Sequence, residues 1–266
     1  MPDLTISISD LEAAAALGWR APDTGWLGGW LLRAAAGFTG RANSALVTGD
    51  PGLPLAAALG EVRAWYAARG LAAMLAVPFP MSGPADSPVD QVAAGLGWPL
   101  RQAPAIVMTA DPAAIARPAS TGPASTGPDV TVTAEPDEAW IAGYHYRGGE
   151  LPPAGRRLLV SAPWQAFASI REAGRPVAIG RVAGDGTWAG LTAVETDPAW
   201  RRRGLASAIT TALAQEAVQH GVRGLYLQVE GENRAARALY RRAGFADHHR
   251  YHYRMAPAAS GRAGEG

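Results

Sequence analysis

Residues 191–245 read LTAVETDPAWRRRGLASAITTALAQEAVQHGVRGLYLQVEGENRAARALYRRAGF, and the patterns in this stretch decide the fold. Its first residues, 191–194, form an apolar run typical of a buried strand. A turn with three consecutive arginines comes next, and a periodic apolar pattern follows it. The apolar residues recur every three or four positions, as on the buried face of a helix: Leu205, Ile209, Ala212, Leu213 and Ala217. The pattern therefore predicts a strand, a turn and a helix in succession.

The rest of the stretch predicts a second strand and a second helix. Between residues 225 and 229 apolar and polar side chains alternate, which is the period of a strand. Asn233 is placed to cap the next helix, and Gly244 is placed to end it. The whole unit is therefore strand, arginine-glycine turn, helix, strand and helix.

The arginine-glycine turn has the features of an anion site. The first backbone N–H groups of a helix lack intrahelical partners and carry partial positive charge. Gly204 and Ala206 have little or no side chain, so a ligand can approach that backbone closely. The arginines add charge and donors that suit phosphate: Arg201, Arg202 and Arg203. We therefore expect this turn to bind a pyrophosphate.

The composition of the chain excludes several classes of chemistry. Its 266 residues are enough for one large domain or two small ones. The chain has no cysteine, which excludes disulfides, a thiolate nucleophile and cysteine-ligated zinc. All 24 basic residues counted as lysine or arginine are arginine. Without lysine, the glycine turn cannot be the P-loop of an ATPase, and a pyridoxal Schiff base cannot form.

The charge is distributed unevenly along the chain. Residues 1–116 carry a net charge of −3, whereas residues 117–266 carry +4. This basic excess suits a small anionic ligand, but it is too scattered to indicate nucleic-acid binding. The sequence has no secretory signal and no apolar run long enough to span a bilayer. We therefore expect a cytoplasmic protein without a membrane partner.

Residues 1–116 are predicted to form a smaller α/β unit. The expected elements are a strand at 4–8, a helix at 10–17 capped by Asp10, strands at 26–36 and 42–48, a helix at 53–68, a strand at 71–77, a proline-rich loop at 78–88, a helix at 89–96 and a strand at 105–109. Their order resembles that of residues 191–245. The turn at residues 48–54, TGDPGLP, is acidic and holds two prolines, so we expect no phosphate site in this half.

A repeated pentapeptide marks the boundary between the two halves. Residues 119–123 and 124–128 both read ASTGP, which is typical of a linker and predicts one at 117–128. The second domain, 129–257, is expected to precede a disordered tail at 258–266. Its further elements are a strand at 130–134, a helix at 138–146 capped by Asp137, a helix at 154–161, a hairpin at 165–172 and 177–182, a strand at 186–193 and a strand at 246–255.

The turn and the second helix together resemble the GNAT superfamily of N-acetyltransferases. Arg201-x-x-Gly204-x-Ala206 is similar to the acetyl-coenzyme A motif of that family, although the hexapeptide alone is weak. Here it is joined, at family spacing, to Asn233-x-x-Ala236-x-x-Leu239-Tyr240-x-x-x-Gly244-Phe245. The resemblance covers about residues 129–256 and, for residues 1–116, is limited to element order. It implies a mixed central β-sheet flanked by helices, preceded by a smaller, degenerate GNAT-like domain.

The resemblance also implies roles for individual residues. The strands at 191–196 and 225–230 would splay apart, and the arm of acetyl-CoA would lie between them, bonded to backbone near Val194 and Thr196. The pyrophosphate would rest on the N–H groups of residues 202–206, Leu205 included. Asn233 would touch the cofactor arm, and Tyr240 would protonate the departing thiolate. The amine would attack the thioester directly, which agrees with the absence of cysteine.

The general base is not settled by the sequence. Many family members carry a glutamate about six positions before the residue that matches Thr196, and this chain has Gly190 there. Glu195 and Glu230, at the ends of the two splayed strands, are the candidates from that region. His145, His249 and His252 titrate in a useful range and stay as alternatives.

Two aromatic-histidine clusters are candidates for an acceptor pocket. They are Tyr144-His145-Tyr146 and Tyr251-His252-Tyr253, and both could equally belong to an interface or an edge strand. From them we select Tyr144, His145 and His252 as substrate-binding residues. No pair of histidines has a metal-ligand spacing supported by carboxylates, so we expect no metal.

Together these features favour transfer of an acetyl group from acetyl-CoA to a primary amine of a small molecule or peptide. Two alternatives remain. One is a non-catalytic module that binds acyl-CoA, which the glycine at position 190 favours. The other is an acyltransferase that uses a different donor, such as succinyl-CoA, with an acceptor other than an amine. The chain could act as a monomer or a homodimer.

Overall fold

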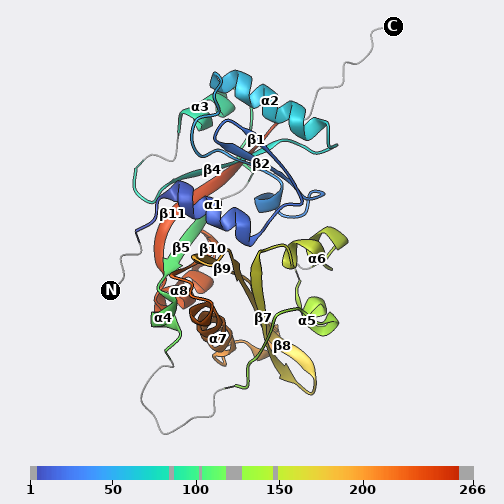
Figure 1. Ribbon diagram of the computed structural model, residues 1–266, viewed down its shortest axis with the longest axis vertical. Helices are drawn as coiled ribbons and strands as arrows, with labels where there is room; N and C mark the ends of the chain where they lie inside the picture. Colours follow the sequence, from blue (N-terminus) through green and yellow to red (C-terminus); the bar gives the residue numbers. More distant parts are fainter. Residues whose placement is uncertain (1–4, 84–86, 102–103, 118–127, 146–148, 258–266) are drawn as a thin grey trace.

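The computed structural model describes residues 5–83, 87–101, 104–117, 128–145 and 149–257. These residues form one eleven-stranded sheet with helices on both faces (Figure 1). Its strand order is β1-β2-β3-β4-β11-β5-β10-β9-β8-β7-β6. The strands are β1 (Asp23–Leu27), β2 (Trp30–Ala34), β3 (Ala45–Leu46), β4 (Met74–Pro80), β5 (Ala105–Ala110), β6 (Thr131–Thr133), β7 (Trp164–Glu172), β8 (Arg175–Gly184), β9 (Trp188–Thr196), β10 (Gly224–Glu230) and β11 (Ala246–Met255).

Helices of both halves cover this sheet. They are α1 (Ile8–Gly18), α2 (Leu55–Ala67), α3 (Pro88–Gly95), α4 (Pro112–Ile115), α5 (Glu138–Gly143), α6 (Pro153–Leu159), α7 (Leu205–Gln219) and α8 (Arg234–Ala243), with short 3-10 turns η1 (Gly40–Ala42) and η3 (Pro198–Trp200). In the described part of the chain, no helix is both long enough and apolar enough to cross a membrane.

The two halves repeat one arrangement of elements. In the first half, β3 and β4 are parallel and joined through α2, and α3 and β5 follow. In the second half, β9 and β10 are parallel and joined through α7, and α8 and β11 follow. This agrees with the repeat of element order predicted from the sequence.

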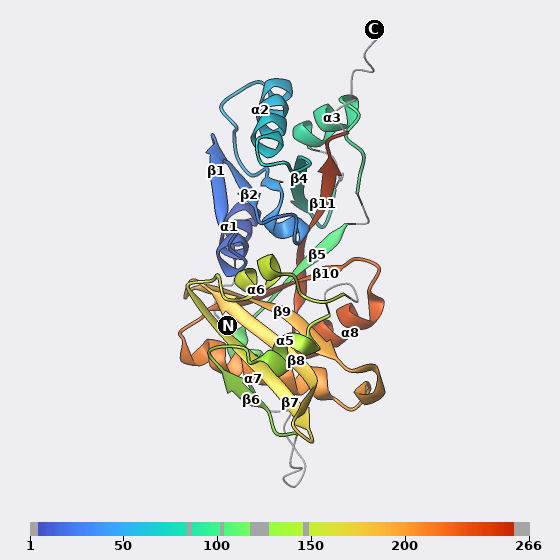
Figure 2. The same ribbon diagram turned by 90° about the vertical axis from the view of Figure 1, so that its right-hand side faces the viewer.

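The last strand of each half lies within the other half. β11 is inserted between β4 and β5, and β5 is inserted between β11 and β10 (Figure 2). All of these contacts are antiparallel. The sheet is therefore continuous across the boundary predicted at residues 117–128. Most of that linker, and the tail at 258–266, lie outside the described residues, and the domain division stays a prediction.

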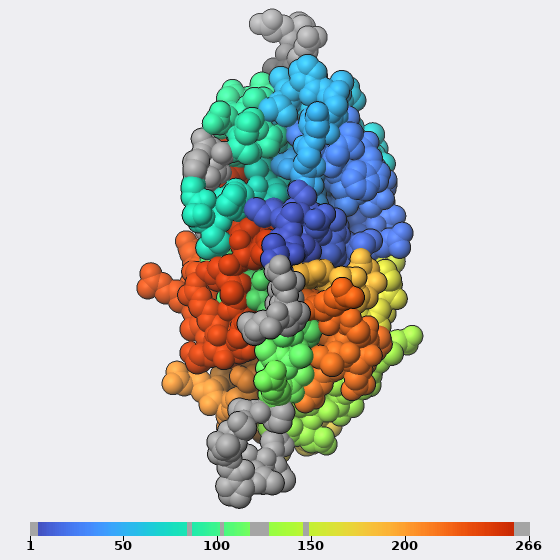
Figure 3. Space-filling model, turned by 60° about the vertical axis from the view of Figure 1, so that its left-hand side comes forward, coloured from blue at the N-terminus to red at the C-terminus, as the bar shows by residue number. Residues whose placement is uncertain are grey.

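Helix α1 holds the two halves together. It packs on β9 and β8 of the second half and lies at the junction of the halves on the surface (Figure 3). Arg181 of β8, fully buried, donates to the carbonyls of Gly18 (3.1 Å) and Leu159 (2.6 Å), at the C-terminal ends of α1 and α6. A cation is favourable at helix C-termini. Burial nevertheless lowers the pKa of Arg181 to about 9.

Several local predictions for the first half are wrong. Residues 5–7 are not a strand, and α1 begins at Ile8 with Ser7, rather than Asp10, as its cap. Residues 26–36 are not one strand, because a turn at Gly28, where φ is 53°, separates β1 from β2. Pro78 and Pro80 lie inside β4 rather than in a loop. β3 pairs with β4 only at Leu75 and Ala76. The two prolines lie beyond that pairing, so their missing N–H groups cost no hydrogen bond to β3.

Candidate active site

A cavity opens where β9 and β10 separate. Their parallel ladder runs from the pair Gly224 and Trp188 to the pair Leu227 and Leu191. Beyond it, residues 191–195 and 227–230 line opposite walls of a cavity of about 350 Å³. The splay expected for these two strands is therefore present.

A β-bulge in β9 shapes one wall of this cavity. Ile179 pairs with Glu195, but Arg181 pairs with Thr192, so β9 has one extra residue opposite Gly180. Ala193 lies there with a φ of 53°, which is rare for a residue with a side chain. Such strain is found preferentially at functional sites.

The bulge sets the direction of Glu195. Leu191 packs in the core beneath α7, and in a regular strand Glu195, four residues later, would face the same way. Ala193 instead packs with the core beneath α5 and α6, and Val194 returns to the α7 side. Because the bulge adds one residue to β9, the side chains after it point to the opposite face of the sheet from the one they would occupy in a regular strand. Glu195 consequently points away from α7, toward α5.

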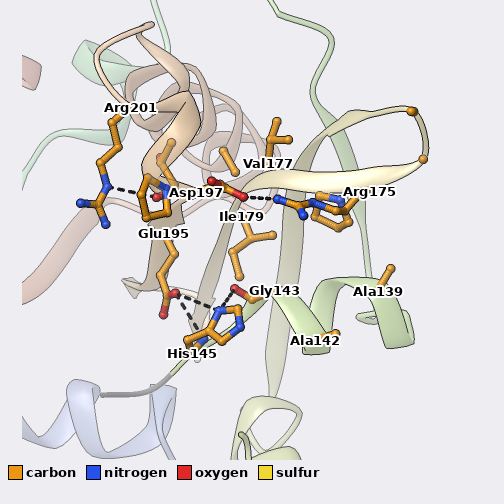
Figure 4. A pocket seen from close by; sticks show the side chains of 16 residues that line it. Ala139, Ala142, Gly143, His145, Arg175, Val177, Ile179, Glu195, Asp197 and Arg201 are labelled. Atoms are coloured by element: carbon orange, nitrogen blue, oxygen red, sulfur yellow. Dashed lines mark hydrogen bonds and ion pairs between the residues drawn. The ribbon is translucent and has the colours of Figure 1, made fainter. Parts of the chain in front are cut away.

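Glu195 is held by the segment that follows α5. Its Oε2 accepts the backbone N–H of His145 at 3.2 Å, and the His145 Nδ1 atom lies 4.0 Å away (Figure 4). Burial raises the pKa of Glu195 above the usual glutamate value, while the N–H and ring of His145 and the charge of Arg201 oppose that rise. The carboxylate is therefore a stronger base than an exposed glutamate.

Gly190 has no room for the glutamate that many family members carry at that position. Tyr226 of β10 pairs with Gly190, and a Cβ atom on Gly190 would lie 2.4 Å from the Tyr226 ring. The Tyr226 hydroxyl also lies against Gly18 of α1. Tyr226 thus fills the space, and the carboxylate that β9 contributes to the cavity is that of Glu195.

Tyr240 lines the cavity from α8. Its ring packs against Phe245 with the centroids 5.7 Å apart, and burial raises its pKa to about 12. The hydroxyl therefore stays protonated at neutral pH and can donate a proton. This is the state required for the acid role expected of Tyr240.

The arginine turn leaves the start of α7 open. Asp197 accepts the N–H of Ala199 at 2.9 Å and forms an ion pair with Arg175, which fixes the turn to the β7–β8 hairpin (Figure 4). Gly204 is the N-cap residue of α7 and has a φ of 77°. Among the described residues, no side chain accepts a capping hydrogen bond from the start of this helix. Such an uncapped start leaves backbone N–H groups for an anion.

The three arginines of the turn differ in their contacts. Arg201 donates from Nε to the carbonyl of Thr196 at 3.3 Å, and the Arg203 guanidinium stacks over Trp200. Arg202 has a φ of 63°. All three side chains are exposed, whereas the Leu205 side chain is buried in the core. Leu205 therefore offers a ligand only its backbone.

The remaining cofactor-site candidates lie on or beside the splayed strands. Asn233 caps α8, as predicted, by accepting the N–H of Ala236 at 3.0 Å, and it also lines the cavity. Val194 and the exposed Glu230 line it as well. The Thr196 hydroxyl is buried and has no hydrogen-bond partner among the described residues. Val194, Glu230, Asn233 and Tyr240 thus line one cavity, whereas Thr196 and Arg201 line the neighbouring one.

Only part of the proposed acceptor pocket agrees with the structure. Tyr144 and His145 line the cavity. His252 does not: its ring is buried against Asp90, with Nε2 2.6 Å from Oδ1, and lies outside the cavity. His249, a candidate base, is fully buried and contacts Glu12 at 2.9 Å. We therefore discard both histidines. Tyr146 lies outside the described residues.

Strand alternation explains the error at His252. Tyr251 and Tyr253 face the cavity, and the residue between them must face the other side of β11. The cavity also receives Thr39, Gly40, Arg41 and Arg101 from the first half, which sequence reasoning missed. The alternation of β11 could have indicated the two tyrosines, but no local pattern indicated the loop residues.

A larger cavity, of about 930 Å³, lies on the other side of Glu195. It is bounded by α5, the β7–β8 hairpin and the arginine turn, and it shares Glu195 and His145 with the first cavity (Figure 4). Tyr240 and Asn233 do not line it. The smaller cavity, which joins the candidate acid and base, is the better candidate for the chemistry. Within the described ranges, no group of three or more histidine, aspartate or glutamate residues could hold a metal ion.

Known proteins resemble this chain over nearly its whole length. Residues 5–254 match the family described as "Probable histone acetyltransferase Rv0428c C-terminal". The probable histone acetyltransferase Rv0428c of Mycobacterium tuberculosis is 32% identical over 97% of this chain and 76% of its own length. The uncharacterized N-acetyltransferase YobR of Bacillus subtilis is 27% identical over 93% of this chain and 98% of its own.

Solved structures show the same fold. A GCN5-related N-acetyltransferase from Kribbella flavida superposes with a TM-score of 0.65 at 20% identity, covering 95% of this chain and 97% of its own. A tandem GNAT protein from the clavulanic acid biosynthesis pathway gives a TM-score of 0.60 at 17% identity, covering 95% and 88%. The GNAT-like α/β fold predicted from the sequence is confirmed.

Proposed function

This chain belongs to the acetyltransferase family of Rv0428c and is an acyltransferase. On that premise, we propose that it transfers an acetyl group from acetyl-CoA to a primary amine. The acceptor is a small molecule or a peptide. The observation that carries this proposal is the cavity between β9 and β10, which has the candidate acid Tyr240 and the candidate base Glu195 in its lining. The uncapped start of α7, a short turn after β9 in the chain, supports a pyrophosphate site there.

The proposed reaction is a direct transfer. Glu195 accepts a proton from the ammonium group, either directly or through a water molecule, and leaves a neutral amine. The amine nitrogen attacks the thioester carbonyl carbon, and the carbon–sulfur bond breaks. The Tyr240 hydroxyl donates its proton to the departing sulfur, and the proton that the nitrogen loses as the amide forms returns to Tyr240 through solvent. General acid and base groups of this kind each contribute about 10²–10⁴-fold to rate.

Release of free thiol from acetyl-CoA, measured with a panel of primary amines, tests the proposal. We expect thiol release that depends on the amine and an acetylated product detectable by mass spectrometry. A protein that does not bind coenzyme A in calorimetry, or that releases no thiol with any amine, would be incompatible with it. The name of the Mycobacterium relative makes lysine-containing peptides one part of the panel.

The two alternative functions give different results in the same assay. A module that only senses acyl-CoA would bind coenzyme A without turnover. Its main support was the glycine at position 190, and the position of Glu195 in the cavity removes the need for a base there. Comparison of acetyl-CoA with succinyl-CoA at a fixed acceptor distinguishes a different donor.

A further inference from the structure

The loop between β2 and β3, residues 35–44, forms a wall of the β9–β10 cavity although it belongs to the first half of the chain. Asn43, buried at the centre of this loop, fixes its backbone. Its Oδ1 accepts the N–H groups of Ala35 and Gly37, both at 2.8 Å, and its Nδ2 donates to the carbonyls of Phe38 and Thr39. The loop is therefore a rigid part of the cavity.

The tip of this loop is strained and closely packed. Thr39 has a φ of 59°, and its hydroxyl accepts the indole N–H of Trp19 at 3.0 Å. A Cβ atom on Gly40 would lie 2.8 Å from the Tyr253 ring, so only glycine allows this approach. These contacts place the next residue, Arg41, in the cavity wall beside Tyr253.

Arg41 brings a positive charge to this side of the cavity. Its guanidinium lies 5.1 Å from the Trp19 ring centroid. Burial raises the pKa of Tyr226 and of Tyr253, and the charge of Arg41 opposes that rise in both. Arg101, also from the first half, is the second arginine in the lining. Its guanidinium donates to the Met74 sulfur at 3.2 Å, and its backbone N–H donates to the Tyr253 carbonyl at 2.9 Å.

The positive and negative side chains of the cavity come from different halves of the chain. Both arginines come from the first half, and both carboxylates, Glu195 and Glu230, come from β9 and β10 of the second half. A ligand with an amine at one end and an anionic group at the other matches this arrangement. Guanidinium groups bind carboxylates through charge-assisted, often paired hydrogen bonds.

We propose that the acceptor is an amine that also carries a carboxylate, such as a free amino acid or a short peptide with a free C-terminus. Arg41 and Arg101 bind the carboxylate while the amine meets Glu195. The first half of the chain therefore determines acceptor specificity rather than only covering the site. This inference rests on the proposed function, because it names the acceptor class of the same site.

Matched pairs of acceptors test this inference in the full-length protein. Each short peptide is compared with its own C-terminal carboxamide in the thiol-release assay, so that the carboxylate changes while the reacting amine keeps nearly the same basicity. We expect a kcat/KM for the acid that exceeds that of the amide by about 10- to 100-fold. Arg41→Gln and, separately, Arg101→Gln should remove most of that preference by raising KM for the acid, with little change for the amide.

Arg223→Gln is the matched control, because it removes one arginine at the opposite end of β10 from Glu230. It should keep the preference of the wild-type protein. Coenzyme A binding shows whether each variant is folded, and the wild-type comparison decides the question even if neither variant folds. Equal rates with acids and amides overturn the acceptor class but leave the proposed function intact. Absence of thiol release with every amine overturns both.

Discussion

At Glu195, burial and local hydrogen bonding act on one carboxylate in opposite directions. Burial is the larger effect and raises the pKa, while the N–H of His145 stabilises the ionised form. The result is a carboxylate oriented by the bulge at Ala193 and more basic than a solvated glutamate. Glu230, the other candidate, is exposed at the end of β10.

This difference predicts a pH dependence. A base with a raised pKa is protonated, and so inactive, up to a higher pH than an ordinary glutamate of pKa 4.5. The kcat/KM for acetyl transfer should therefore rise with pH through a limb that lies above that value. Glu195→Gln should remove the limb and lower kcat by about 10²–10⁴-fold.

Glu230→Gln is the control for this pH profile, since it changes the other carboxylate in the same cavity. It should keep the acidic limb. A limb that disappears in Glu230→Gln and survives in Glu195→Gln would assign the base to β10 instead.

At the scale of elements, the start of α7 depends on its left-handed residue. Gly204 and Gly221 lie at the two ends of this helix with φ values of 77° and 71°, and nothing lies within 4 Å of a Cβ built on either. Alanine at these positions is strained by about 1–2 kcal/mol. Only Gly204 adjoins the expected pyrophosphate.

Gly204→Ala and Gly221→Ala form a matched pair for this reason. Both should lower the free energy of unfolding by a similar amount in urea denaturation. We expect Gly204→Ala alone to weaken coenzyme A binding, by about 10-fold, because it displaces the N–H groups of the turn. Equal coenzyme A affinity in the two variants, measured by calorimetry, would place the pyrophosphate elsewhere.

The sequence predicted the elements whose signals are local. The arginine turn, the Asn233 cap and the β7–β8 hairpin depend on residues close together in the chain, and the family motif reinforced the first two. The bulge at Ala193 has no such signal, because it arises from how β8 and β9 pair. His252 was misassigned because a cluster in sequence was treated as a cluster in space.

At the scale of the whole molecule, the exchange of β5 and β11 joins the two halves in one continuous sheet. Each half contributes the strand that completes the sheet of the other, and Arg181 joins α1 to the second half. The repeated order of expected elements predicted two similar halves but not this exchange, because strand pairing between distant segments leaves no local pattern. The wall of the cavity formed by residues 35–44 is a consequence of the same arrangement.

Separating the halves should therefore abolish folding of each. Residues 129–266 expressed alone lack β5, which leaves the edge of β10 unpaired and prone to aggregation. Coexpression with residues 1–116 should restore a soluble complex and thiol release. This account of the sheet would be disproved if residues 129–266 alone eluted as a monomer in size-exclusion chromatography and released thiol at the full rate.

A crystal structure of the complex with coenzyme A is the most direct test of the central claim, that the chemistry occurs where β9 and β10 separate. The account predicts the pyrophosphate at residues 202–206, the pantetheine arm between β9 and β10, and the sulfur facing the Tyr240 hydroxyl. Coenzyme A bound instead in the larger cavity beside α5, away from Tyr240, would contradict it.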